Sequence, residues 1–83
     1  MTIRVRYFAS IREALGTGET INSDAAGTIG RLREQLISKS PKHAAALAPD
    51  KALRCALNQA MCSESDDVAD GDEVAFFPPV TGG

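Results

Sequence analysis

Residues 70–83 read DGDEVAFFPPVTGG and combine a turn, a strand and a tail that cannot continue the strand. The opening DGD tripeptide is a turn signal. The EVAFF segment that follows places Val74 and Phe76 on one face, with the period of two that is typical of a β-strand. Pro78 has no N–H to donate to a sheet, so the strand is predicted to end at Phe77.

The tail comprises the last six residues, which are Pro78, Pro79, Val80, Thr81, Gly82 and Gly83. Adjacent prolines favour an extended polyproline conformation, and six residues can reach about 20 Å. The glycines have no side chain, so they can pass through a narrow channel and bring the backbone close to a reactive centre. A frayed terminus is the alternative, but it does not explain prolines followed by an apolar valine. We predict a folded domain over residues 1–77 and an extended tail over residues 78–83.

Upstream of this stretch, the sequence predicts a strand, a short helix, a second strand, a long helix and two more strands. Residues 2–8 alternate between two faces, and Ser10 and Glu13 have the spacing of a capping box that would start the short helix. Thr28 is expected to cap the long helix, which should end by Ser40 because a proline follows. The other strands are predicted over residues 19–23, 53–57 and 60–62. The predicted inner positions are Ile3, Val5, Tyr7, Ile29, Leu32, Leu36, Val74 and Phe76. Ile37 is a further candidate on the inner face of the long helix.

The charge of the chain is unevenly distributed. A length of 83 residues allows one small domain, and 43% apolar with 24% charged residues is typical of a globular protein. Residues 1–54 hold nine basic and five acidic residues, whereas the remainder holds six acidic and no basic ones. This acidic end is either a solvated loop or a surface that meets a basic partner. Nucleic acid is disfavoured as a partner, because its phosphates would repel this end.

The N-terminus has no apolar signal region, and no apolar run approaches the length of a membrane span. We therefore expect a cytoplasmic protein that does not bind a membrane. Cys55 and Cys62 are then expected to be reduced thiols that pack as small hydrophobic residues. Together with His43, they cannot supply four zinc ligands, so no metal site is predicted. His43 is expected to be a surface or turn residue, because no recognisable nucleophile accompanies it.

Three segments resemble one known family. Residues 70–83 closely resemble the C-terminus of molybdopterin synthase small subunits, which are ubiquitin-like sulfur carriers. VRYFASIREALG at residues 5–16 and LNQ at residues 57–59 resemble other parts of that family, so the resemblance spans nearly the whole chain. It implies an α+β protein with the β-grasp fold. That fold has a mixed sheet, parallel first and last strands at its centre, one main helix across it and a flexible C-terminal tail.

The resemblance also implies a function in which the protein is not catalytic alone. A partner ATP-dependent activating enzyme would adenylate Gly83, and a sulfur donor would replace AMP to give a thiocarboxylate. The large synthase subunit would take up the tail, residues 78–83, in a heterotetramer of two small and two large subunits. The sulfur would then attack cyclic pyranopterin monophosphate and build the dithiolene of molybdopterin. No cofactor is expected to be bound to this chain.

Three other functions fit a Gly-Gly terminus. The chain could be a ubiquitin-like modifier joined through Gly83 to lysines of other proteins. It could be a sulfur carrier for another pathway, such as the thiazole of thiamin, although that family has shorter chains. A non-catalytic binding module with an irrelevant tail is the remaining alternative.

A docking face is predicted from strand parity. Phe8 and Phe77 fall opposite the core positions of two strands that the implied fold places side by side, and Met61 lies in a short strand nearby. Aromatic and Met side chains are enriched in the cores of protein interfaces. These residues are therefore predicted to bind the large subunit and the activating enzyme in turn, with residues 64–73 at the rim. The alternative is that a curled sheet or the helices bury them.

Overall fold

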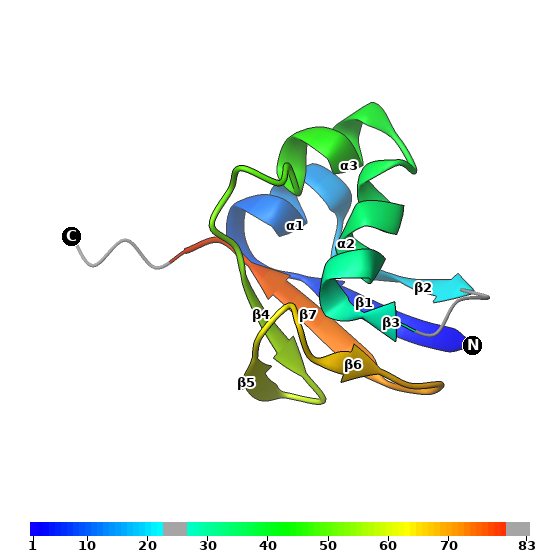
Figure 1. The fold of residues 1–83 in the computed structure, drawn as a ribbon. Helices are drawn as coiled ribbons and strands as arrows, with labels where there is room; N and C mark the ends of the chain where they lie inside the picture. Colours follow the sequence, from blue (N-terminus) through cyan, green and yellow to red (C-terminus); the bar gives the residue numbers. More distant parts are fainter. Residues whose placement is uncertain (23–26, 80–83) are drawn as a thin grey trace.

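The computed structural model describes residues 1–22 and 27–79, which form a mixed sheet with three helices on one of its faces (Figure 1). The five strands of this sheet run in the order β2-β1-β7-β4-β5. The elements are β1 (Thr2–Tyr7), α1 (Ala9–Leu15), β2 (Gly18–Asn22), β3 (Gly27–Thr28), α2 (Ile29–Ile37), α3 (Pro41–Ala46), β4 (Arg54–Leu57), β5 (Ala60–Cys62), β6 (Asp67–Val68) and β7 (Glu73–Phe77).

The centre of the sheet confirms the β-grasp arrangement that the family resemblance implied. The first strand, β1, and the last, β7, are parallel neighbours, and the remaining pairs in this sheet are antiparallel. A second, two-stranded sheet pairs β3 with β6. The sequence did not predict this second sheet, because strands of two residues are too short to show a period.

The core lies between the sheet and the helices, at the positions that strand and helix periodicity predicted. The eight predicted inner residues are all buried, and each is at most 4% exposed. Burying a side chain of this kind contributes about 1.5–3 kcal/mol. Leu47 and Ile11, from the shorter segments, belong to the same cluster, and Ile37 is half-buried and packs against it.

The start of α1 differs from the prediction. The helix begins at Ala9, with Phe8 at the N-cap and no side-chain cap, so the capping box of Ser10 and Glu13 is wrong. The reason lies in the neighbouring strand: the Phe8 N–H donates to the Phe76 carbonyl, and the Phe8 carbonyl already accepts from Arg12. The chain therefore passes from sheet to helix within one residue, and Ala9 makes the change with a φ of 52°.

The start of α2 agrees with the prediction, and a distant loop supports it. The Thr28 hydroxyl accepts a hydrogen bond from the Arg31 N–H at 3.3 Å. The N–H groups of Ile29 and Gly30 donate to the carbonyls of Asp66 and Glu64, which satisfies two groups that a helix start leaves unpaired. A β-carbon on Gly30 would lie 3.3 Å from the Glu64 carbonyl oxygen, so glycine allows this close approach.

The end of α2 agrees with the prediction. The helix ends at Ile37, before Ser40, and α3 begins at Pro41 with Ser40 as its own cap. Residues Pro41–Ala46 therefore form a separate short helix. Within the described ranges, no helix is both long enough and apolar enough to cross a membrane.

Candidate functional site

The tail begins where the central pair of strands ends. β7 ends at Phe77, as predicted, and is followed by a half-buried Pro78 and an exposed Pro79. Four of the predicted tail residues, Val80, Thr81, Gly82 and Gly83, lie outside the described residues. The structure therefore positions the root of the tail directly after Phe77, at the end of β7.

Phe8 and Phe77 lie together on the face of the sheet that carries no helix, which we call the outer face. Their ring centroids are 5.4 Å apart, at an interplanar angle of 56°, and both side chains are half-buried. The parallel register pairs Tyr7 with Phe76 on the helix side of the sheet. Phe8 and Phe77, which follow them, therefore lie next to each other on the opposite face. Both rings lie outside the buried core cluster, so the helices do not cover them.

Met61 is on the outer face as well, two strands away from β7. Its register partner is Ala56, whose other partner is Ala75. The two alanines are small and only 5–6% exposed, so they form a floor beside the more prominent Phe77 ring. Met61 is 60% exposed, which is unusual for a large apolar side chain on this molecule. The alternation of residues along a strand does not predict the alanine floor, because it does not indicate which strands are neighbours.

Arginines border this apolar patch. Arg4 and Arg6 alternate with the buried residues of β1, so they project from the outer face, and Arg54 is the register partner of Phe77. The Arg6 guanidinium carbon lies 5.4 Å from the centroid of the Phe8 ring, within cation–π distance. The outer face therefore combines apolar side chains with positive charge, and it would suit a partner surface that is apolar with an acidic border.

The acidic residues that were predicted to border the docking face mainly hold loops in place. Asp66 accepts a hydrogen bond from the Ser63 N–H, and Asp70 accepts one from the Thr2 N–H. Asp72 accepts from the Asn58 side chain and from the Ala69 N–H, and these bonds hold the pKa of its carboxyl below the ordinary value. Such contacts account for much of this acidic segment without a partner.

A polar network lies on the helix side of the sheet, centred on Glu19 of β2. Its carboxylate accepts from the Tyr7 hydroxyl at 2.7 Å and from His43 Nε2 at 2.7 Å, and it pairs with Lys39. Burial of Glu19 raises its pKa, but the hydrogen bonds from Lys39, His43 and Tyr7 outweigh burial and hold it at about 2. Burial, together with the Glu19 contact, raises the pKa of Tyr7.

His43 is therefore not the surface residue that the sequence predicted, since its side chain is only 14% exposed. Ser40 lies 2.7 Å from His43 Nδ1, which gives a Ser-His-Glu series. The Ser40 hydroxyl, however, also caps α3 by accepting from the His43 N–H at 3.2 Å. We interpret the series as a structural link between α3 and the sheet, because the serine is engaged in the cap.

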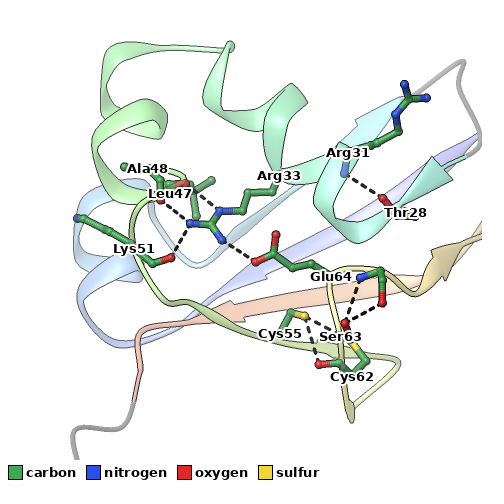
Figure 2. Close-up of polar contacts among 11 residues, drawn as sticks. Thr28, Arg31, Arg33, Leu47, Ala48, Lys51, Cys55, Cys62, Ser63 and Glu64 are labelled. Carbon is green, nitrogen blue, oxygen red and sulfur yellow. Dashed lines mark hydrogen bonds and ion pairs between the residues drawn. The ribbon is translucent and has the colours of Figure 1, made fainter.

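A buried arginine, Arg33 of α2, connects three segments of the chain (Figure 2). Its Nε donates to the Leu47 carbonyl at 2.9 Å, and its Nη1 donates to Glu64 at 2.6 Å. Its Nη2 donates to the carbonyls of Ala48 and Lys51. No pattern in the sequence predicted this role, because Arg33 is one of two arginines on the predicted helix and is not distinguished from Arg31.

The two cysteines lie in neighbouring strands, Cys55 in β4 and Cys62 in β5. Cys55 is 3% exposed and belongs to the core, as predicted, and Cys62 is half-buried. Neither is in a disulfide. Among the described residues, no three His, Cys, Asp or Glu side chains gather in a way that could hold a metal ion.

A protein family and a curated protein each match this chain over nearly its whole length. The model of the ThiS family matches residues 5–83. A molybdopterin synthase sulfur carrier subunit from Escherichia coli (strain K12) is 44% identical over 81 residues, which cover 98% of this chain and 99% of that protein.

Solved structures agree with the fold. SAMP1 from Haloferax volcanii matches with a TM-score of 0.81 at 25% identity, covering 100% of both chains. A chain from the complex of subunits 1 and 2 of the molybdopterin-converting factor from Helicobacter pylori 26695 matches with a TM-score of 0.66 at 27% identity, again over 100% of both chains. These likenesses support the ubiquitin-like β-grasp fold.

Proposed function

Because this chain belongs to the ThiS family, we propose that it is the sulfur-carrier subunit of a molybdopterin synthase. The observation that carries the proposal is the 44% identity to a subunit of that name over nearly the full length of both chains. The proposal places the chain in the cytoplasm, the compartment in which stable structural disulfides are rare.

The proposed reactions take place at the backbone carboxyl of Gly83. A C-terminal carboxylate has a pKa of about 3.5, so it is ionised at neutral pH and is a poor acyl donor. A partner ATP-dependent activating enzyme would convert it to an acyl-adenylate and release pyrophosphate. A sulfur donor would then displace AMP and leave a thiocarboxylate. Two such carriers would deliver the two sulfurs that convert cyclic pyranopterin monophosphate to the dithiolene.

The described body of the protein supports a carrier role rather than a catalytic one. The charged side chains of Glu19 and Arg33, for example, are engaged in contacts between secondary structure elements. The partner enzymes would supply the catalytic groups. This chain would supply a recognisable surface and a tail that is narrow at its end, since Gly82 and Gly83 have no side chains.

We further propose that the outer face docks both the large synthase subunit and the activating enzyme. Phe8, Phe77 and Met61 would anchor the contact, with the arginines around them. Two observations support this: the face carries no helix, and Phe77, which lies on it, directly precedes the tail. The related Helicobacter pylori protein, solved in a complex of subunits 1 and 2, supports a large-subunit partner.

Mass spectrometry of the protein isolated from cells tests the carrier chemistry. The thiocarboxylate form should be heavier than the parent by about 16 Da, the exchange of one carboxylate oxygen for sulfur. Isopeptide conjugates to lysines, without any thiocarboxylate, would instead indicate the protein-modifier function. Transfer of the sulfur to a thiazole precursor would indicate the thiamin pathway.

Two tail variants test the site on Gly83. Deletion of Gly83 should abolish sulfur transfer, while Gly82→Ala should load or discharge sulfur poorly because a β-carbon would obstruct a narrow channel. Both variants should melt at nearly the parent temperature, because neither residue belongs to the predicted folded domain. Full sulfur transfer by the deletion variant would exclude the proposed site.

Calorimetric titration against the large subunit tests the docking face. Phe77→Ala should weaken binding by about 2 kcal/mol, the loss expected for a central aromatic anchor. Lys42→Ala, an exposed residue of α3 on the helix side, is the matched control and should bind normally. If Phe8→Ala and Phe77→Ala melt much earlier than the parent but bind normally once folded, these rings are part of the core and docking occurs elsewhere.

A further inference from the structure

Cys55 and Cys62, the two cysteines of this chain, face each other across the β4–β5 hairpin (Figure 2). They are direct register partners, and their sulfur atoms are 3.5 Å apart. The turn between the strands is tight: Asn58 and Gln59 have φ values of 49° and 70°, which suit a two-residue hairpin. The hairpin therefore holds the two thiols opposite each other.

The geometry is close to that of a disulfide. Partner Cα atoms in an antiparallel pair are about 4.5–5.5 Å apart, which lies within the range of about 4.4–6.8 Å that a disulfide allows. The sulfurs would have to approach each other by about 1.5 Å to form the bond of about 2.05 Å. Rotation about the side-chain bonds can supply a movement of this size without a change of register.

We propose that Cys55 and Cys62 form a redox-active dithiol, which closes to a cross-strand disulfide by exchange with a small-molecule disulfide such as oxidised glutathione. This site is independent of the sulfur chemistry proposed for Gly83. It requires neither the tail nor a partner protein, and its chemistry consists of two successive thiol–disulfide exchanges.

The order of the two exchanges follows from exposure. Both cysteines border an open groove that also includes Met61 and Pro79, but Cys62 is half-buried whereas Cys55 is only 3% exposed, so Cys62 reacts first. Its thiol loses a proton and attacks one sulfur of the oxidant, which forms a mixed disulfide and releases one thiol molecule. Cys55 then loses its proton and attacks the Cys62 sulfur, and the second thiol molecule departs. The protein loses two electrons and two protons, and the oxidant gains both.

Cys55 is suited to the second step only. Burial, reinforced by its contact with Cys62, raises the pKa of the Cys55 thiol to about 12, so this group remains protonated at neutral pH. A protonated, buried thiol does not attack an external oxidant, because the thiolate is the nucleophile. Once Cys62 carries a good leaving group 3.5 Å away, however, the attack becomes intramolecular.

The disulfide would have a local structural effect. It would join the middle of the sheet to the end of β5, next to Met61 of the proposed docking face and before Glu64, the partner of Arg33. The β4–β5 hairpin would then be unable to separate at its open end. Met61 of the outer face would then lie on a covalently closed hairpin.

Oxidised glutathione, added to the reduced, folded full-length chain, tests the proposal. After denaturation, a thiol-alkylating reagent should label two cysteines before oxidation and neither afterwards. Intact mass should show the loss of two hydrogen atoms, and the protein should remain a monomer on a non-reducing gel. Dithiothreitol should restore both thiols.

Single variants test the order of the steps and serve as matched controls. Cys55→Ser should stop at a glutathione adduct on Cys62, whereas Cys62→Ser should react at least about tenfold more slowly, because its remaining thiol is buried. The proposal is overturned if the parent chain keeps two alkylatable thiols, accumulates a stable adduct at Cys62 or forms covalent dimers. Equal reaction rates for the two variants would overturn the assigned order.

Discussion

Replacement of Arg33 by Met removes the contact that joins α2 to two distant segments. The guanidinium makes four hydrogen bonds, of which three are to backbone carbonyls, and its side chain is 7% exposed. Met has a similar length and fills much of the space, so the variant loses polar contacts more than packing. The carbonyls remain in place, because no side-chain substitution removes a backbone acceptor.

The expected cost follows from the number and burial of these bonds. The Leu47 carbonyl is buried, and leaving it unpaired costs about 1–3 kcal/mol. The bonds to Ala48, Lys51 and Glu64 are closer to solvent and contribute about 0.5–1.5 kcal/mol each. Some of this loss is recovered, because a charged group is no longer desolvated, so we expect a net loss of about 4 kcal/mol.

Such a loss is large for a domain of this size. At about 0.05–0.15 kcal/mol per residue, 83 residues give a free energy of unfolding of about 4–12 kcal/mol. With about 4–8 °C for each kcal/mol, the melting temperature of Arg33→Met should fall by about 15–30 °C. The variant is therefore expected to be partly unfolded at growth temperature if the parent lies near the lower limit.

Urea denaturation and thermal melting, each followed by circular dichroism, measure the effect. Arg31→Met is the matched control, since Arg31 lies two residues earlier in α2 with an exposed side chain. The control should unfold within about 0.5 kcal/mol of the parent. Arg33→Lys keeps the charge but loses the planar fork, so it should fall between the parent and Arg33→Met. The reasoning is refuted if Arg33→Met and the control are equally stable.

Two further predictions concern stability. Because the folded pKa of Glu19 is lowered to about 2, its charged form stabilises the fold above the ordinary pKa of 4.5, and this contribution is lost as pH falls through 2. Melting curves should therefore show Glu19→Gln well below the parent at neutral pH and approaching it by pH 2; parallel curves would contradict the assignment. Gly18→Ala would place a β-carbon against the Val5 carbonyl oxygen and 3.2 Å from the Arg6 Cα, so urea denaturation should show a loss of about 2 kcal/mol. Thr20→Ala, in the same strand, should lose much less, and equal losses would argue against the steric explanation.

Local patterns were sufficient for most elements of the fold. The alternation in residues 2–8 and the proline that follows Phe77 predicted the two central strands, and the helical period predicted the inner face of α2. Such patterns are informative because a strand or helix buries one face, and the burial leaves a period in the residues. The parallel pairing of the two strands came from the family resemblance, since periodicity carries no information about partners.

The candidate site was predicted only in part, for the same reason. Strand parity put Phe8 and Phe77 on one face, but the alanine floor and the bordering arginines depend on which strands are neighbours. The capping box at Ser10 failed because a contact with Phe76 starts the helix earlier. His43 was placed on the surface because its partner, Glu19, is distant in sequence.

Residue order was enough to specify which segments become strands, where the last strand stops and which side chains face inward, because those properties depend on neighbours within one turn or one pleat. Folding was needed to bury Arg33 among carbonyls of residues 47–51 and to set the sulfur of Cys55 3.5 Å from that of Cys62. No periodic pattern in the sequence indicates that the segments joined by these contacts will touch. Their energies depend on distance and burial, which exist only after the sheet and helices have packed.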